Sequence, residues 1–479
     1  MTKKSISRLL QASLMCCLAV LFTACDDIFA SEDNPTPAYL SMSDKPVTIK
    51  VGDTYRRKAI SVTTAVVEYT SSNTNVATVD GEGVVTAIAK GETTITATAT
   101  GYSTGGKKIF LADSKSYVVT VVPATVPATS LSLDKTMKVL VKDGAALTLT
   151  ATVTPSDATF TWTSSDEAVA TVANGVVTPV GLGIATITAK SGDVKATCEV
   201  FVGNEVALGA AAYEAKNYDI LKGNMGANQL TIPDGYHVAL DGLTINNNNI
   251  TCNGEATIYL IDGSTNTITV LGYYAGIEVG AAGLTINAET AGTGILNVTG
   301  GGYSAGIGTS DADGSSQACG DITINGGTIT ATGGNLAAGI GTGESWGSSA
   351  PTNQTCGNIK INGGIVTAIG GGFAAGIGTG FSNAASKVTS NRCGTITIGT
   401  GVTSVTAIMG YSSPVSIGMG LANNGGTQTC GTITFGTAQV FDGTAATGTW
   451  TPSPMVAGTY GGLNLAISGS TWTLTPVAP

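Results

Sequence analysis

The sequence has little charge, and its few charged groups are mostly acidic. Asp, Glu, Lys and Arg make up 11% of the 479 residues, and the net charge is −10. A protein that binds nucleic acid needs clustered Lys and Arg to neutralise phosphates, so the balance argues against a nucleic-acid partner. Metal ligands are also scarce. His237 is the single histidine, and no two cysteines have the Cys-x-x-Cys spacing of zinc sites. We therefore expect no metal and no cofactor.

Acid–base machinery is also sparse in the second half of the chain. Enzymes that cleave glycans need paired carboxylates, or acidic calcium ligands with a basic residue. From Tyr303 to the end, the charged residues do not form a recurrent cluster. They are Asp311, Asp313, Asp321, Glu344, Lys360, Lys387, Arg392 and Asp442. We expect no catalytic residues and no enzyme, with a polysaccharide lyase or hydrolase kept as an alternative.

Long apolar runs are absent after the N-terminus, so no later segment is expected to span a bilayer. The first residues have a positive start, at Lys3, Lys4 and Arg8, and an apolar stretch over residues 9–22. This order is typical of a secretory signal. Leu-Phe-Thr-Ala-Cys at 21–25 resembles a bacterial lipobox. The resemblance implies a signal peptide over residues 1–24 and acylation of Cys25, which would anchor the protein in a membrane.

Residues 25–37 are rich in Ser, Asn, Pro and acidic side chains, which predicts a flexible tether. Its acidic start, Asp26-Asp27, resembles the surface-export signals of Bacteroidetes lipoproteins. That resemblance implies an outer-membrane lipoprotein facing the cell exterior, and an orientation toward the periplasm stays open.

What the chain does contain is glycine, 66 residues of it, among short alternating runs of Thr, Ala, Ile and Val. Such runs predict strands and turns rather than helices. Residues 38–203 also hold a duplication, in which Tyr69 and Trp162 occupy equivalent Ser-Ser-flanked positions and Val-Ala-Thr-Val starts at residues 76 and 169. This pattern predicts antiparallel sandwiches.

The two copies, residues 38–123 and 126–203, resemble the group 2 bacterial immunoglobulin-like domain. The resemblance implies stiff spacers. For Tyr69 and Trp162 a place in the core is favoured over a role in stacking on sugars.

Residues 204–479 carry a different repeat. The dipeptide Cys-Gly begins at 319, 356, 393 and 430, always 37 residues apart, and Ala-Gly-Ile recurs at 275–277, 305–307, 338–340 and 375–377. A fixed period predicts a solenoid. Each period holds three strand-like pieces, for example 322–324, 328–332 and 338–341. We therefore predict an all-β chain, in which two immunoglobulin-like sandwiches precede a right-handed parallel β-helix with ~37-residue coils.

The alternation within a period predicts which side chains point inward. Ile322, Ile324 and Ile329 are expected to stack on their equivalents in neighbouring coils. The recurring Asn246, Asn287, Asn325 and Asn362 are replaced by Gly399 and Gly436 in the last two periods. Because Asn and Gly tolerate positive φ, we expect a column of left-handed turns, similar to the asparagine ladder of pectate-lyase-like β-helices.

The four cysteines of the repeat fall in one column. A disulfide would need side chains that point toward each other, whereas stacked side chains are parallel. We expect Cys319, Cys356, Cys393 and Cys430 to be buried thiols that act as small apolar fillers.

Two sets of residues are candidates for ligand binding. The loops before each Cys-Gly contain aromatic and charged side chains, which grip sugar rings by apolar stacking and oriented hydrogen bonds. These are Trp346, Phe381, Glu344, Asp311, Asp313 and Arg392. The alternative for Trp346 and Phe381 is that they pin their loops to the coil. The second set lies three residues before the glycine of Ala-Gly-Ile, at Tyr273, Tyr303 and Phe373, where a core role is favoured because Leu336 shares the column.

The segment from about residue 240 resembles carbohydrate-binding β-helix domains of bacterial surface proteins, which are relatives of pectate lyases without catalysis. The strongest phrases are Ile-Tyr-Leu-Ile at 258–261 and Leu-Thr-Ile-Asn at 284–287. The resemblance implies a non-catalytic surface protein that binds a polysaccharide or host glycan or mediates adhesion. A structural adhesin with a protein partner is the alternative.

Overall fold

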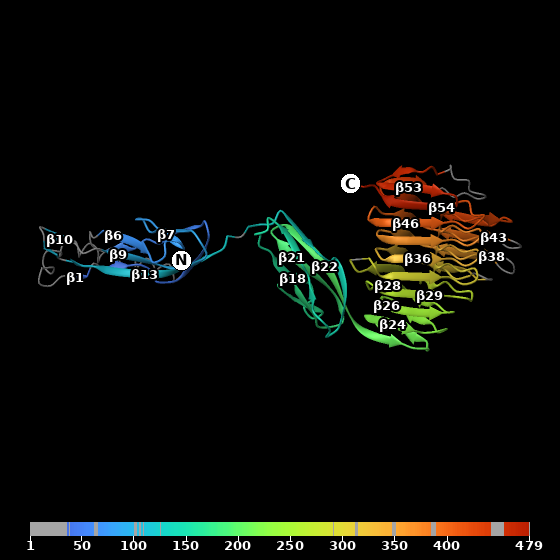
Figure 1. Cartoon of the computed structure of the whole chain (residues 1–479), viewed down its shortest axis with the longest axis horizontal. Coiled ribbons are helices and arrows are strands. Elements are labelled where there is room, and N and C mark those ends of the chain that lie inside the picture. The colour runs from blue at the N-terminus through green and yellow to red at the C-terminus, as the bar shows by residue number, and fades with distance from the viewer. Residues whose placement is uncertain are drawn as a thin grey trace, which may run out of the picture. The chain divides into compact units, whose positions relative to one another are not determined.

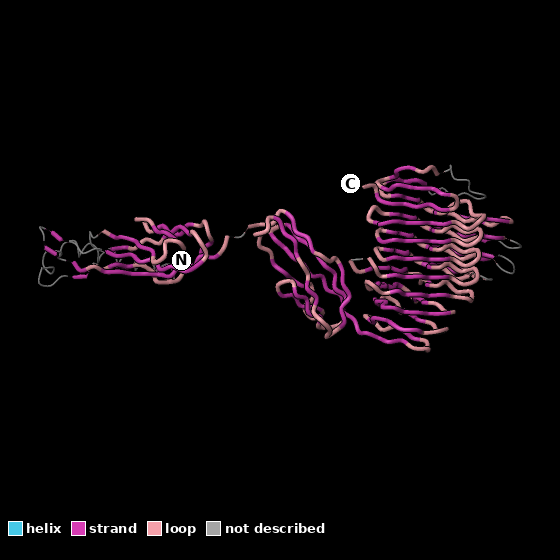
Figure 2. The backbone as a smooth tube through the Cα atoms, viewed as in Figure 1, coloured by secondary structure: helices cyan, strands magenta, loops and turns pink. Residues whose placement is uncertain are grey.

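The computed structural model describes residues 36–37, 39–61, 66–99, 103–104, 107–108, 110–124, 126–290, 292–311, 315–346, 351–384, 389–441 and 455–478. Over these ranges every regular element is a β-strand, which confirms the all-β class (Figures 1 and 2). None of these residues belongs to a helix able to cross a membrane. Cys25, the signal peptide and Asp313 lie outside the described residues. The chain forms two compact units, residues 1–127 and 128–479.

The first unit contains a β-sandwich. One sheet has the order β3 (Val47–Lys50), β13 (Asp113–Val122), β9 (Gly91–Ala99) and β6 (Val67–Ser71). The other has the order β4 (Thr54–Arg56), β8 (Val84–Ala87) and β7 (Ala77–Val79). Alternate residues such as Val85, Ile95 and Val119 are fully buried in its core. Tyr69 packs against the same core, and its hydroxyl accepts a hydrogen bond from the Ala59 amide at 2.6 Å.

The second unit begins with an equivalent sandwich. Its larger sheet has the order β15 (Met137–Val141), β22 (Val194–Leu208), β21 (Gly183–Ser191) and β18 (Thr161–Ser164). The facing strands are β16 (Leu147–Thr148), β20 (Val176–Pro179) and β19 (Ala170–Ala173). Trp162 packs on the core around Ile187 and Val200, so the expectation of a core aromatic is confirmed in both sandwiches.

The rest of this unit is a stack of parallel strands, coloured green to orange in Figure 1. Its first ladder runs through β24 (Asp219–Asn224), β26 (Tyr236–Asn246), β28 (Glu255–Leu260), β31 (Gly283–Ala288), β35 (Ile322–Ile324), β40 (Ile359–Ile361), β45 (Ile396–Ile398) and β50 (Ile433–Phe435). Beside it runs a second ladder of β29 (Thr265–Thr269), β32 (Ile295–Thr299), β36 (Thr328–Thr332), β41 (Gly364–Ile369) and β46 (Val402–Ile408).

Three further ladders complete the coils, of which the first runs along the stack and the other two occur only in the later coils. The first contains β23 (Tyr213–Glu214), β25 (Leu230–Ile232), β27 (Ile250–Cys252), β30 (Ile277–Glu278), β33 (Ile307–Gly308), β37 (Ile340–Gly341), β42 (Ile377–Gly378) and β47 (Ile417–Gly418). The second contains β34 (Gln317–Cys319), β39 (Thr352–Cys356), β44 (Thr389–Cys393) and β49 (Thr427–Cys430). The third contains β38 (Ser345–Trp346), β43 (Ser382–Asn383) and β48 (Ala422–Asn423). These last two form in the loops that precede each cysteine, where the sequence predicted no strands.

The core of the β-helix is built from columns of stacked side chains. Ile322 pairs with Ile359, which pairs with Ile396, and Ile324 begins a similar column. Ile322, Ile324 and Ile329 are buried as predicted. Stacking at ~4.8 Å lets equal side chains fill equal space. The predicted 37-residue coil holds only in the later part of the stack, since Val238 pairs with Ile258, 20 residues on, and Ile258 pairs with Ile286, 28 residues on.

A column of glycines explains the residue that follows each Ala-Gly-Ile phrase. Gly308, Gly341 and Gly378 have φ of 143°, 133° and 131°. A Cβ on any of them would overlap the carbonyl oxygen of the equivalent glycine in the next coil. Only glycine fits where coils approach this closely in that conformation.

The asparagine column differs from the prediction. Asn325 Nδ2 donates to Asn287 Oδ1, and Asn362 Nδ2 donates to Asn325 Oδ1, both at 2.8 Å. Positive φ occurs instead two residues later, at Gly327 and Gly364, with 90° and 84°. Of the predicted left-handed column only Gly436, with a φ of 57°, is left-handed, and the prediction is wrong for the asparagines. A glycine without Cβ takes the strained conformation, and the amide side chains are left to form a hydrogen-bonded ladder.

Strand β22 joins the second sandwich to the β-helix. Its first part pairs with β21, and its last residues, Asn204 to Leu208, pair with β24 in the first coil. The boundary predicted between residues 203 and 204 thus falls inside one continuous strand. At the other end, β54 (Thr471–Pro476) pairs antiparallel with β46 and with β53 (Leu463–Ser468), so antiparallel strands cover the last coil.

Candidate functional site

An exposed row of large side chains lies at the turn after the second ladder. We call it the aromatic edge: Leu271, Tyr273, Tyr274, Tyr303, Leu336, Phe373 and Tyr411. Tyr273 is 63% exposed and Tyr411 is 83% exposed, and Leu271 and Tyr274 also face solvent. Tyr303, Leu336 and Phe373 are half-buried. The sequence favoured a core role for Tyr273, Tyr303 and Phe373. Tyr273 is instead exposed, and the other two are only partly buried.

Glycine turns hold the rings of the aromatic edge in place. Tyr273 and Tyr303 stack with centroids 6.3 Å apart and planes at 22°, and Phe373 meets Tyr411 at 5.4 Å. A Cβ on Gly302 would meet the Tyr273 ring at 2.6 Å, and one on Gly372 would meet Leu336. The absence of these Cβ atoms lets each side chain lie on the backbone of the following coil. The result is a semi-rigid apolar row along the stack.

The backbone of the aromatic edge also holds the loops that contain the other candidates. The amide of Glu344 donates to the Tyr303 carbonyl, and the amide of Phe381 donates to the Leu336 carbonyl, both at 2.8 Å. These bonds turn the side chains of Glu344 and Phe381 under the loops, where they are 2% and 3% exposed. The expectation that the two line an exposed face is wrong, because each loop folds back onto the preceding coil.

The environment of Glu344 changes its acidity. Within the described residues its Oε1 atom has no hydrogen-bond partner. Burial, with a smaller effect from the Asp311 carboxylate, raises the pKa of Glu344 to about 8. A carboxyl group in this position holds its proton near neutral pH. It is placed to affect stability rather than to bind a ligand from solvent.

The remaining loop candidates are spread over the surface. Trp346, on β38, is 39% exposed and pairs with Asn383 of the next coil. Arg392 is exposed on β44, between Thr355 and Thr429 of the neighbouring strands. The loop candidates therefore do not form one binding face, because Glu344 and Phe381 are buried while Trp346 and Arg392 are exposed at separate places.

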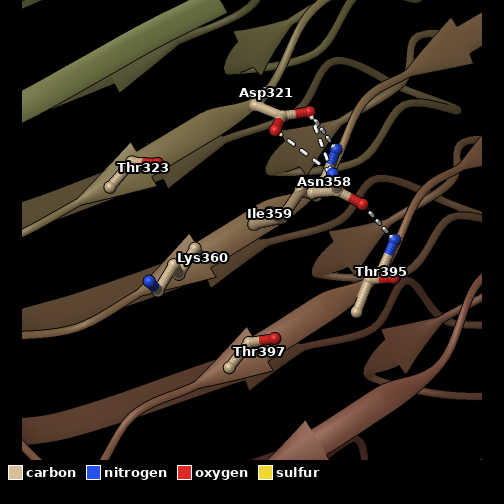
Figure 3. Close-up of a pocket in the computed structure, with 7 residues that line it drawn as sticks. All are labelled: Asp321, Thr323, Asn358, Ile359, Lys360, Thr395 and Thr397. Carbon is tan, nitrogen blue, oxygen red and sulfur yellow. Dashed lines mark hydrogen bonds between the residues drawn. The ribbon is translucent and has the colours of Figure 1, made fainter.

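A shallow depression of about 300 Å³ lies on the outer face of β35, β40 and β45 (Figure 3). Asp321, Asn358 and Thr395 form a ladder there, in which Asp321 Oδ1 accepts from the Asn358 amide at 2.7 Å and Asn358 Oδ1 accepts from the Thr395 amide at 2.9 Å. Thr323 and Thr397 flank Lys360. This polar depression was not predicted. The alternation of the strands could have indicated it, since residues between the buried isoleucines must face outward.

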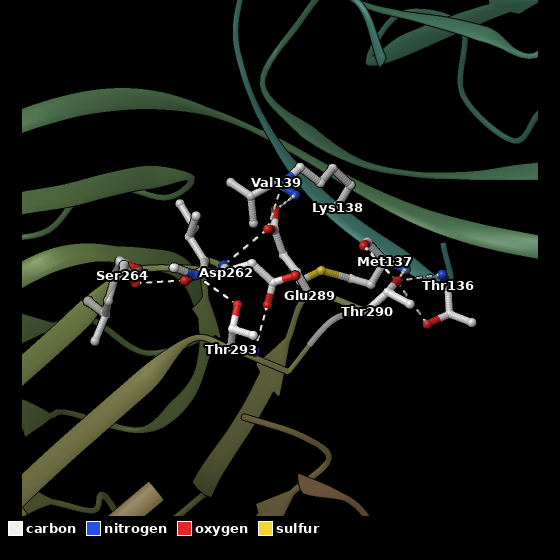
Figure 4. Close-up of polar contacts among 12 residues, drawn as sticks. Thr136, Met137, Lys138, Val139, Asp262, Ser264, Glu289, Thr290 and Thr293 are labelled. Atoms are coloured by element: carbon white, nitrogen blue, oxygen red, sulfur yellow. Dashed lines mark hydrogen bonds and ion pairs between the residues drawn. The ribbon is translucent and has the colours of Figure 1, made fainter. Parts of the chain in front are cut away.

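A second polar group joins the sandwich to the β-helix (Figure 4). The buried carboxylate of Glu289 forms an ion pair with Lys138 Nζ at 2.6 Å and accepts from the Val139 amide at 2.7 Å. Thr290 Oγ1 accepts from the Thr136 amide at 2.7 Å. Since these groups satisfy one another, this cluster holds two parts of the unit together.

Comparison with known proteins agrees with this architecture. Residues 39–109 and 127–200 match the family model of the bacterial Ig-like domain (group 2), and residues 322–344 and 359–381 match the β-helix repeat. The chain therefore contains two group 2 bacterial Ig-like domains and a region of β-helix repeats. No curated protein matches it.

Several solved structures are similar to parts of the chain. Domains 4 and 5 of the S-layer protein SbsC share 24% identity over 29% of this chain and 76% of that one, with a TM-score of 0.14. Mouse cadherin-23 EC22–24 shares 15% identity over 36% of this chain and 65% of that one, with a TM-score of 0.19. The N-terminal four Ig domains of Dscam1 isoform 6.44 share 13% identity over 36% of this chain and 47% of that one, with a TM-score of 0.21. Scores this low place no constraint on function.

Proposed function

We propose that the β-helix binds glycan without cleaving it, and that the aromatic edge is the binding site. The observation that carries the proposal is the exposure of Tyr273, Tyr274 and Tyr411 on one edge of a rigid stack. An exposed aromatic ring contributes apolar contact area at little cost in conformational entropy, and its hydroxyl adds a directed hydrogen bond. Sugar rings present the matching combination of apolar C–H faces and hydroxyls.

The remainder of the chain fits a role in presentation. The two Ig-like domains serve as spacers, and acylation of Cys25 anchors the chain in the outer membrane with the β-helix facing outward. An adhesin with a protein partner is the second candidate, favoured by the exposure of the aliphatic Leu271, which cannot stack or donate a hydrogen bond. In the described part of the repeat, the carboxyl group that Asp311 affects is that of Glu344, which is buried, and this supports a role without catalysis.

The glycan site is tested with the variant Tyr273→Ala/Tyr274→Ala on a glycan array. We expect its affinity to fall by roughly tenfold or more, since ~1.4 kcal/mol of lost contact has that effect. Stability should change by less than about 1 kcal/mol because the side chains are solvent-exposed.

Trp346→Ala is the matched control, because it removes an exposed aromatic away from the aromatic edge. Loss of binding in Trp346→Ala with normal binding in the tyrosine variant would move the site to the loops. If no glycan binds the native chain, while host-protein binding depends on Leu271, the adhesin is the correct reading.

The anchor is tested separately by Cys25→Ala. Two or more acyl chains hold a protein firmly on a bilayer, at ~0.8 kcal/mol per buried CH₂. We expect the variant to move from the membrane fraction to the soluble fraction of the producing cells. If it still sediments with membranes, the protein is held there by something other than a lipid on Cys25.

A further inference from the structure

Four buried thiols form a continuous column in the β-helix. Cys319, Cys356, Cys393 and Cys430 end the strands β34, β39, β44 and β49, and each is the direct ladder partner of the next. All four are free and buried. They belong to the main apolar core, so their environment is dry and fixed by the stacked isoleucines.

The sulfurs of this column interact with each other. Each thiol stands directly beside the thiol of the adjacent coil, and Cys393 Sγ and Cys430 Sγ donate to the carbonyls of Gly357 and Gly394 at 3.9 and 3.8 Å. The neighbouring thiols lower the pKa of Cys393, against the effect of burial. The same coupling raises the pKa of Cys356 and Cys430. The titration of each thiol in the column therefore depends on its neighbours.

The other described cysteines lack this arrangement. Cys198 is paired with Ile187, and Cys252 is paired with Ile232. Burial raises the pKa of both thiols to about 12. They act as single apolar fillers, and they provide an internal comparison for the column.

The spacing of the column suits a particular coordination geometry. A metal–thiolate bond is about 2.3 Å long, so two such bonds in line span roughly the ~4.8 Å rise between coils. Within the described residues, no group of three or more His, Cys, Asp or Glu side chains is placed to hold an ion. Each pair of adjacent coils places two of the thiols side by side, and two thiolates suit soft ions that accept linear coordination.

We propose that the column binds soft monovalent cations such as Cu(I) or Ag(I), each ion bridging the sulfurs of two adjacent coils. On binding, each ligating thiol releases its proton to solvent and forms a metal–sulfur bond, and no electrons are transferred. Four sulfurs in line hold two ions, one between Cys319 and Cys356 and one between Cys393 and Cys430. This binding does not depend on a glycan ligand.

The proposal is tested by titrating the full chain with Ag(I) in chloride-free buffer and counting bound ions by native mass spectrometry. The reference is the variant with all four cysteines of the column changed to alanine. Ions bound by the other cysteines are present in both proteins and are removed by subtraction. We expect the native chain to bind two more ions than the reference, and its melting temperature to rise with Ag(I).

Two double variants then separate bridging from binding by single thiols. Cys319→Ala/Cys356→Ala keeps one adjacent pair and should bind one ion. Cys356→Ala/Cys430→Ala keeps the same number of thiols but no adjacent pair, and should bind none. Melting curves without silver establish that both variants are folded. Equal silver binding by the two folded variants, or no extra ions on the native chain, would overturn the proposal.

Discussion

Phe381→Ala is expected to lower the free energy of unfolding of the β-helix by about 3–5 kcal/mol, the usual cost of truncating a buried phenylalanine. The side chain is 3% exposed, and its ring lies 5.0 Å from that of Phe373. Truncation leaves a cavity beneath a loop whose backbone is hydrogen-bonded to the preceding coil, so the site cannot collapse freely. Urea denaturation followed by tryptophan fluorescence measures the loss.

Trp346→Ala is the comparison, because it removes a larger ring from an equivalent loop one coil earlier. Its side chain is 39% exposed, so the change in stability should be less than half of that for Phe381→Ala. Equal losses in the two variants would mean that the loops pack alike. A negligible loss of stability for Phe381→Ala would mean that the Phe381 ring faces solvent and is not part of the core.

The second large effect concerns pH. The pKa of Glu344 rises from its ordinary value of 4.5 to about 8 on folding. Between these values the folded chain binds a proton that the unfolded chain has lost, so stability falls as pH rises. The contribution is fully present below pH 4.5 and is lost as the pH passes through 8. Over the whole interval this amounts to roughly 4–5 kcal/mol, at ~1.4 kcal/mol per pH unit.

Glu344→Gln keeps the shape of the side chain and cannot ionise. We expect native and variant chains to have similar free energies of unfolding near pH 4.5, and the variant to be the more stable at pH 8.5. The measurement is a series of urea denaturation curves at fixed ionic strength. A pH dependence that is the same in both chains would show that Glu344 ionises freely in the fold, and that Asp311 or another group carries the effect.

Features that repeat along the chain could be predicted from the sequence. The duplication of the Ig-like domains and the 37-residue period both follow from local patterns that recur, and a column of Ile322, Ile359 and Ile396 follows from the period and the alternation of the strands. The main ladders of the β-helix can therefore be predicted from the sequence alone. The burial of Ile324 and Ile329 follows from the same two patterns.

Features that depend on how a loop closes could not be predicted in this way. Trp346 and Phe381 stand in similar loops, yet one ring faces solvent and the other is buried. The two rings occupy different positions of the repeat, because Trp346 pairs with Asn383 while Phe381 corresponds to the buried Glu344. Which position faces inward is set by β38 and β43, two strands that the sequence did not predict. The ion pair of Lys138 with Glu289 joins positions 151 residues apart, and only the folded chain brings these two together. The exposure of Tyr273 likewise depends on glycines of the next coil.

The continuous strand β22 has a mechanical consequence. Its residues pair with β21 of the Ig-like domain and with β24 of the first coil. Tension applied along this strand loads the hydrogen bonds of both ladders in shear, so that many must break together rather than one after another. The Lys138–Glu289 pair resists the remaining motion, which is the tilting of the domain away from the coils. Force on a captured ligand therefore passes into the second Ig-like domain without a compliant joint between them.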